Sequence, residues 1–207
     1  DDDEPILNNN GIYSVKREYD ENGLLLEEGY YGIDNKPILN INEIASVKKE
    51  YDDDGNVCAE RYYDTNGAET VSKAGHHRVE RTFENKLAVS EAWFDVDGKP
   101  YHLNNDTYVK LGREYDENGN ISVIRYYGED GKPVALNAGY DELHQVVNEK
   151  KQVVRIEYYL GGERVLINNG ISALEREYDE NGKAVRIDAV VISSQHAAEI
   201  SQEQIHE

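Results

Sequence analysis

Several residue types are scarce in this sequence, and each scarcity narrows what the chain can be. Cys58 is the only cysteine among 207 residues, so no disulfide forms within the chain, and we interpret it as a small buried residue of a strand. No run of 18 apolar residues occurs, and no basic segment followed by an apolar one opens the chain. We therefore expect neither a membrane-spanning segment nor an export signal in this sequence.

Basic residues are also few: 22 Lys and Arg stand against 42 Asp and Glu, which gives a formal charge of -20. A field of that sign repels polyanions, so nucleic acid and a bare anionic membrane surface are poor partners. We expect no nucleic-acid partner and, without a long apolar run, no membrane insertion. Calcium, cationic surfaces and neutral polymers remain open as partners. The hydrophobic content of 38% and the mean hydropathy of -0.79 are low for a thick core, but they suit repeats that each bury a thin layer.

Aromatic residues are mostly tyrosine, with 16 Tyr against 2 Phe and 1 Trp, and they recur at a fixed spacing. Tyr19, Tyr51, Phe83 and Tyr115 are 32 residues apart, and the step continues to Val147 and, one residue short, to Tyr178. A second ladder of adjacent aromatic pairs follows ten to twelve residues behind the first column: Tyr30-Tyr31, Tyr62-Tyr63, Trp93-Phe94, Tyr126-Tyr127 and Tyr158-Tyr159. Such self-similarity predicts one supersecondary unit stacked along an axis.

Each repeat consists of two stretches of alternating polar and apolar residues, separated and followed by clusters of Asp, Asn and Gly. The four-residue clusters at 20–23, 52–55, 116–119 and 179–182 all end in Gly, where a positive φ closes a hairpin loop. The pattern predicts an all-β fold: an elongated single domain, residues 1–192, of about six 32-residue β-hairpin repeats in an open solenoid or single-layer sheet. The predicted repeats lie near 12–43, 44–75, 76–107, 108–139, 140–170 and 171–192, and residues 193–207 are expected to form a short C-terminal helical cap or a tail.

The beginning of the chain resembles the end of a repeat. Residues 4–9 read EPILNN and match KPILNI at 36–41. We therefore expect the sequence to start inside a longer array.

Motifs for catalysis or metal binding are weak. Asp52, Asp53 and Asp54 come closest to a calcium loop, but they lack the distant bidentate Glu of a complete one, and ordinary hairpin turns need the same residues. His76-His77 has no neighbouring Cys or His to complete a zinc site. No nucleophile elbow, zinc-protease or phosphate-loop pattern occurs, so we expect no enzyme and no cofactor, with calcium as a minor alternative.

The aromatic ladders are the strongest candidates for a site. We assign the first column to structure. In each pair of the second ladder, one ring faces the opposite side from its neighbour, because successive residues of a strand alternate. The predicted exposed, ligand-binding row is Tyr31, Tyr63, Phe94, Tyr127 and Tyr159, with Tyr30, Tyr62, Trp93, Tyr126 and Tyr158 as the alternative row.

Three segments resemble a known family: RYYDTNG at 61–67, AWFDVDGKP at 92–100 and RYYGEDGKPV at 125–134 are similar to the YYFDxDGK core of the glucan-binding and choline-binding cell-wall repeats of Gram-positive surface proteins. The REYDENG segments resemble the YD repeats of Rhs and teneurin-type shells. These resemblances imply an extracellular or cell-surface bacterial module, part of a longer chain, that binds polysaccharide or serves as a scaffold. Arg61, Arg125 and Glu157 stand where the cell-wall repeats carry Trp, so the resemblance does not extend to a choline cage.

The sequence thus favours a noncatalytic repeat module that binds a neutral carbohydrate or cell-wall polymer through many weak contacts along its aromatic ladders. The alternative is a structural spacer or a protein-protein interaction scaffold without a ligand. A calcium-stabilised module is a third interpretation.

Overall fold

The computed structural model describes residues 12–191 and contains thirteen β-strands in that range, with one short 3₁₀ turn, η1 (Leu103–Asn105). The strands are β1 (Ser14–Tyr19), β2 (Leu25–Tyr31), β3 (Ser46–Tyr51), β4 (Val57–Tyr63), β5 (Arg78–Glu84), β6 (Leu87–Phe94), β7 (Lys110–Tyr115), β8 (Ile121–Tyr127), β9 (Glu142–Val147), β10 (Val153–Leu160), β11 (Glu163–Arg164), β12 (Ala173–Tyr178) and β13 (Ala184–Val190).

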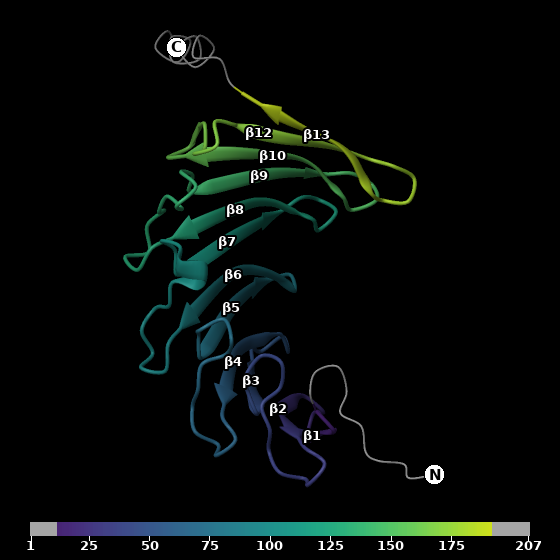
Figure 1. Cartoon of the computed structure of the whole chain (residues 1–207), viewed down its shortest axis with the longest axis vertical. Coiled ribbons are helices and arrows are strands. Elements are labelled where there is room, and N and C mark those ends of the chain that lie inside the picture. Colours follow the sequence, from purple (N-terminus) through teal and green to yellow (C-terminus); the bar gives the residue numbers. More distant parts are fainter. Residues whose placement is uncertain (1–11, 192–207) are drawn as a thin grey trace. The chain divides into compact units, whose positions relative to one another are not determined.

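The chain divides into two compact units, an N-terminal unit of residues 1–110 and a C-terminal unit of residues 111–207. Within each unit the strands pair antiparallel in chain order, as Figure 1 shows, and the short β11 pairs with β10. The predicted all-β class, an open sheet built from successive hairpins, is confirmed. The helix or tail expected at residues 193–207 lies outside the described residues.

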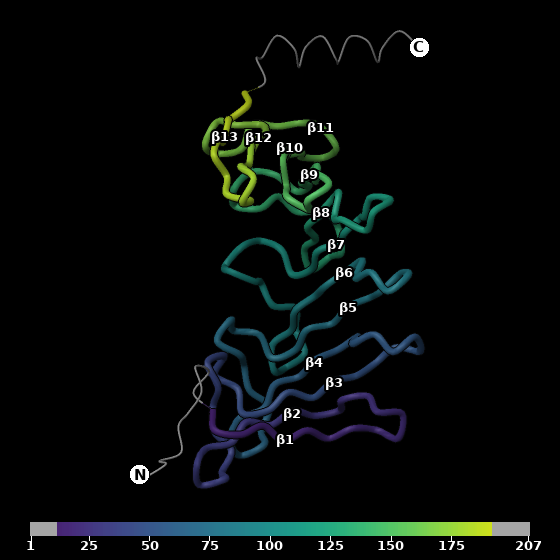
Figure 2. The backbone as a smooth tube through the Cα atoms, turned by 90° about the vertical axis from the view of Figure 1, so that its right-hand side faces the viewer, coloured from purple at the N-terminus to yellow at the C-terminus, as the bar shows by residue number. Residues whose placement is uncertain are grey.

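The hairpin turns of the N-terminal unit lie at one end of its strands and the longer connectors between hairpins lie at the other (Figure 2). In the first turn, Oδ1 of Asp20 accepts hydrogen bonds from the backbone amides of Asn22 (2.9 Å) and Leu24 (2.7 Å). Gly23 follows with φ +84°, a conformation that an L side chain rarely adopts. The same carboxylate cap and glycine recur at Asp52, Asp116 and Asp179, so local turn chemistry explains these acidic clusters.

A β-bulge lies directly before the first-column aromatic residue in most hairpins. The pairing register shifts between Glu50 and Tyr51, for example, and equivalent shifts precede Tyr19, Phe83 and Tyr178. Such a bulge redirects a side chain. The hydroxyl of Tyr51 donates a hydrogen bond to the carbonyl of Leu25 (2.9 Å) in the preceding hairpin, and Tyr178 bonds to Val153 in the same way (2.9 Å). Tyr51 and Tyr178 therefore tie neighbouring hairpins together, whereas the Tyr19 ring is 56% exposed and contributes little to packing.

A different column, in the connectors, contributes to the core beside buried strand residues such as Val47 and Val79. Its members are Ile12, Ile44, His76, Tyr108 and Tyr140, at steps of 32 residues, and then Ile171, one residue short. The first four of these are buried. We call these six residues the connector column. They lie two residues before the strand that opens each hairpin, beside the first aromatic residue of the second ladder.

Candidate functional site

The two residues of each aromatic pair lie on opposite faces of the sheet, and the first residue faces the connector column. The rings of Tyr62 and His76 have centroids 5.6 Å apart, and those of Trp93 and Tyr108 are 5.8 Å apart. Trp93 is buried, as is Tyr158 in the C-terminal unit. These rings therefore contribute to packing between one hairpin and the next.

The second residues of the pairs form the predicted ligand-binding row, and every one of them is partly exposed. Basic or imidazole groups of a neighbouring strand lie over four of these rings. The Nζ atom of Lys16 lies 3.9 Å from the centroid of the Tyr31 ring, and Nζ of Lys48 lies 4.8 Å from that of Tyr63. Arg78 covers Phe94 at 4.4 Å, and the His144 ring stacks on Tyr159 at 4.3 Å.

These contacts occupy part of the ring surface. A cation over a ring face is attracted by the quadrupole of the ring, so each contact stabilises a cross-strand pair. In the fourth hairpin, β7 with β8, Gly112 leaves space instead, because a Cβ atom at that position would lie 3.2 Å from the ring of Tyr127. The row is thus a ladder of ring and cation contacts on the surface rather than a row of bare rings.

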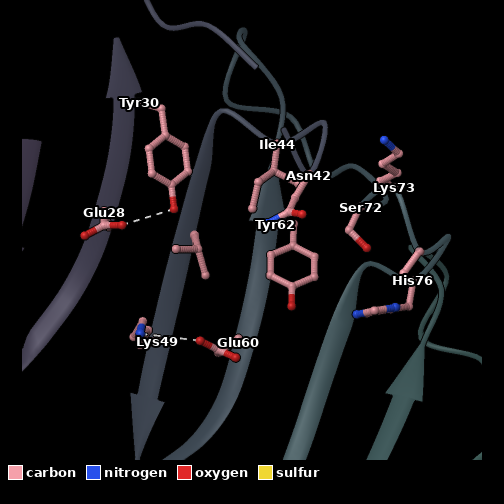
Figure 3. A pocket seen from close by; sticks show the side chains of 12 residues that line it. Glu28, Tyr30, Asn42, Ile44, Lys49, Glu60, Tyr62, Ser72, Lys73 and His76 are labelled. Atoms are coloured by element: carbon pink, nitrogen blue, oxygen red, sulfur yellow. Dashed lines mark hydrogen bonds and ion pairs between the residues drawn. The ribbon is translucent and has the colours of Figure 1, made fainter. Parts of the chain in front are cut away.

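A pocket of about 350 Å³ opens on the opposite face, in the N-terminal unit (Figure 3). Its floor comes from side chains of β2, β3 and β4, and its rim from the two connectors that precede β3 and β5. The backbone amide of Lys73 donates to the carbonyl of Asn42 (2.8 Å) and joins these connectors. Lining residues include Glu28, Tyr30, Asn42, Ile44, Lys49, Glu60, Tyr62, Ser72, Lys73 and His76. We call the face that carries them the pocket face.

Ion pairs hold the charged groups at the base of the pocket. Lys49 Nζ lies 3.4 Å from Oε1 of Glu60, its direct cross-strand partner, and Arg81 Nη1 lies 2.9 Å from the other oxygen of that carboxylate. All three side chains are half-buried, with 20–24% of their surface exposed. Glu28 accepts a hydrogen bond from the hydroxyl of Tyr30 at 3.1 Å. The carboxylates of the pocket are thus fixed in place by neighbouring donors.

Titration behaviour follows from burial. Burial, and then the charge of Glu28, raises the pKa of Tyr30 to about 12, and burial with the charge of Glu60 raises the pKa of Tyr62 to about 12. Both phenols therefore stay protonated in any physiological medium. Burial also lowers the pKa of the His76 imidazole below its ordinary value, so this ring is neutral near pH 7.

Two buried polar atoms beside the pocket have no hydrogen-bond partner among the residues that the structure describes. They are Oγ of Ser72 and Nδ1 of His76. His76 as a whole is only 8% exposed. Buried polar atoms in native structures nearly always have partners, so two neighbouring exceptions call for an explanation.

The adjacent His77 has a structural role. Its Nδ1 atom is 2.9 Å from the carbonyl oxygen of Thr70, and its ring meets the Tyr63 ring edge to face at 6.2 Å. Within residues 12–191, no group of three His, Cys, Asp or Glu side chains has an arrangement that could hold a metal ion. The acidic residues proposed as weak calcium candidates, Asp52, Asp53 and Asp54, lie in the turn before β4, where Asp52 caps the turn amides.

Sequence reasoning did not find the pocket. It identified Tyr30 and Tyr62 as members of the alternative row, but it missed Ile44 and Ser72 and considered His76 only as a zinc ligand. The signal was present, because the connector column repeats with the same 32-residue step as the first aromatic column. Its members change from aliphatic to imidazole to aromatic, so a search for one residue type did not show them.

Comparison with known proteins does not identify a family for this chain. No protein-family model matches the chain, so neither resemblance noted in the sequence gains support from that comparison. Two similar solved structures are the crystal structures of TcdB2-TccC3-TEV and of TcdB2-TccC3 without its hypervariable C-terminal region. Each is 15% identical with a TM-score of 0.34, and the match covers 84% of this chain and 9% of the other. Similarity at this level supports no conclusion about function.

Proposed function

We propose that this chain is a noncatalytic structural repeat module, a spacer or interaction scaffold within a longer bacterial surface or secreted protein. One observation supports this proposal above the others: aromatic side chains in both units are engaged with neighbouring strands or hairpins. In residues 12–191 no helix has the length and apolar character needed to cross a membrane.

The turn carboxylates fit a structural role as well. Oδ1 of Asp64 accepts from the amides of Asn66 (2.8 Å) and Ala68 (2.9 Å), and Asp95 caps the equivalent turn of the next hairpin. Acid-base catalysis needs carboxylates held around a reacting group, whereas these are committed to their own loops.

Deletion of one repeat tests the scaffold. Removal of residues 44–75, one full period, joins equivalent positions of two connectors and should give a folded, shorter module, because each hairpin in such an array contacts only its neighbours. We expect the far-ultraviolet circular dichroism spectrum per residue to be unchanged. Compared with the full chain, the shortened chain should show one cooperative unfolding transition fewer, or a weaker transition. A chain that no longer folds after this deletion would contradict a modular scaffold.

A second candidate is multivalent binding of a neutral carbohydrate or cell-wall polymer by the row Tyr31, Tyr63, Phe94, Tyr127 and Tyr159. Its support is the partial exposure of all five rings at equivalent positions of successive hairpins. Weak sites arranged in this way can add up through effective concentration. Retention of the wild-type module on purified cell walls, lost in a Tyr63→Ala and Tyr127→Ala double variant, would favour this candidate over the pure scaffold.

A further inference from the structure

The pocket of the N-terminal unit has features that hairpin packing does not require. We propose that it binds a neutral sugar, one or two rings in size, through the face of the sheet opposite to the exposed aromatic row. Sugar binding here does not depend on the scaffold role, and it would occur at a single site instead of along the aromatic ladder. The pocket volume of about 350 Å³ lies at the small end of the range for ligand pockets.

Aromatic surface in the pocket suits a sugar. Tyr30 and Tyr62 come from neighbouring hairpins and line the same cavity with Ile44 between them (Figure 3). Flat rings of this kind offer apolar surface for the C–H faces of a pyranose, while their hydroxyl ends remain polar. Both hydroxyls keep their protons, because the pKa of each is raised to about 12.

Hydrogen-bonding groups that line the pocket include both donors and acceptors, as the hydroxyls of a sugar require. Glu28 and Glu60 supply acceptors, Lys49 supplies a donor, and Asn42 supplies both. The unpartnered Ser72 Oγ and His76 Nδ1 belong to two further lining residues. A ligand hydroxyl that enters the pocket would give these atoms the partners that the protein does not provide.

The charge balance favours a neutral ligand. Glu28 and Glu60 offset Lys49 and Lys73, and His76 is neutral. A phosphate site would need an excess of positive charge, and a site for an organic cation would need an excess of negative charge. Neither excess exists among the residues that line this pocket.

The connector column shows how the pocket arises. At Ile44 the column residue is small and aliphatic, and it lies between Tyr30 and Tyr62. At the equivalent place in the C-terminal unit, Tyr140 lies between Tyr126 and Tyr158, with ring centroids 5.9 Å and 4.9 Å from theirs. There the aromatic ring fills the place that Ile44 leaves partly open.

Replacing Ile44 with Tyr, the residue that the chain has at the equivalent position 140, provides the test. Ligand-observed NMR and calorimetric titration with maltose, cellobiose and N,N′-diacetylchitobiose should show saturable binding of at least one sugar to the whole chain. Ile44→Tyr should fill the pocket and weaken that binding by about tenfold or more. Inorganic phosphate at the same concentrations should not compete.

Neighbouring residues of β3 give a matched control. Lys49 lines the pocket, whereas Lys48 lies on the opposite face over Tyr63, so Lys49→Gln should weaken binding and Lys48→Gln should not. If Ile44→Tyr fails to fold, Ser72→Ala tests the proposal in its place: it should weaken sugar binding, whereas Ser90→Ala of β6, outside the pocket, should not.

Three results would overturn the proposal. They are the absence of saturable binding by all three sugars, binding that survives both Ile44→Tyr and Ser72→Ala in folded protein, and binding that is lost in Tyr63→Ala but not in the pocket variants. The last result would move recognition to the exposed row.

Discussion

The pocket face of the N-terminal unit and the same face of the C-terminal unit use equivalent strand positions with different chemistry. In the N-terminal unit the cross-strand pairs are Arg17 with Glu28, Lys49 with Glu60 and Arg81 with Glu91. In the C-terminal unit they are Gln145 with Ile156 and Arg176 with Ile187. One backbone therefore supports ion pairs beside a polar pocket in one unit, and pairs of a polar residue with isoleucine beside packed aromatic rings in the other.

Substitution at one position also shows how the fold keeps a contact when the residue type changes. Val147 stands in the first aromatic column of its hairpin and cannot donate a hydrogen bond. Gln145, two residues earlier on the same strand, donates to the carbonyl of Ile121 at 2.7 Å instead. This bond reaches the first residue of the preceding strand, as the Tyr51 bond to Leu25 does. The link between hairpins is conserved within the chain although the side chain that makes it is not.

Exchanging the residue types of the cross-strand pairs between the two units should have the largest effect on the free energy of unfolding. Glu60→Ile leaves the half-buried Lys49 and Arg81 without their shared carboxylate, and Ile156→Glu places a carboxylate opposite Gln145. We expect each variant to lower the free energy of unfolding by about 1–3 kcal/mol. Chemical denaturation followed by circular dichroism measures this, with the exposed Glu180→Gln as control. Wild-type stability in both variants would show that the chemistry of this face is interchangeable.

Two glycines with the same backbone conformation separate conformational strain from steric contact. Gly75 has φ +90° and Gly170 has φ +79°. A Cβ atom at Gly75 would lie 2.0 Å from the hydroxyl oxygen of Tyr101, whereas one at Gly170 meets nothing within 4 Å. Gly75→Ala should cost about 2 kcal/mol or more and Gly170→Ala about 1 kcal/mol. Truncation of Tyr101 to Ala in the Gly75→Ala background should recover part of the difference; equal losses in the two single variants would contradict the steric account.

Removal of single hydroxyls tests the links between hairpins. Tyr51→Phe and Tyr178→Phe each delete one hydrogen bond to a carbonyl of the preceding hairpin and should cost about 1 kcal/mol of unfolding free energy. Tyr19→Phe, at an exposed ring of the first column, should stay within about 0.5 kcal/mol of the wild type. Similar losses at all three positions would mean that these bonds add nothing specific.

The pH dependence of stability should distinguish His76 from Ile44 in the connector column. Burial lowers the pKa of His76 in the folded chain, so the unfolded chain binds the proton more readily. Its contribution to stability is complete above the unfolded pKa of about 6.5 and declines as the pH falls through that value. The melting temperature of the wild type should fall between pH 7.5 and pH 5.5, and His76→Ile should make this fall shallower. An identical dependence of melting temperature on pH in both proteins would contradict this role of His76.

Calcium should have the smallest effect. Asp52 already caps its own turn, and hydrogen bonds from Asn56, side chain first and then backbone, lower its pKa. We expect the melting temperature to be the same with millimolar calcium as with chelator, because a ligand that does not bind the folded state cannot stabilise it. A rise with calcium that disappears in Asp52→Asn would restore the calcium-stabilised interpretation.

Local patterns allowed much of the fold to be predicted. The Asp-rich clusters ending in Gly specify hairpin turns through side-chain caps and positive φ, and alternation specifies strands, so both could be predicted without tertiary information. The opposite orientation of Tyr62 and Tyr63 follows from the same alternation. The role of each ring did not follow, because Lys48 over Tyr63 and His76 beside Tyr62 come from other strands and connectors.

The sequence by itself determined the repeat length, the hairpins and the division of each aromatic pair between two faces, because these depend on residues close together in the chain. Only the tertiary structure decided which columns contribute to the core and where a pocket opens. Ile44, Tyr62 and His76 lie far enough apart in sequence that no local rule relates them, and they line one cavity because stacking brings successive connectors together. The space around a side chain and its contact partners depend on that stacking, so the site is a property of neighbouring repeats and not of one repeat alone.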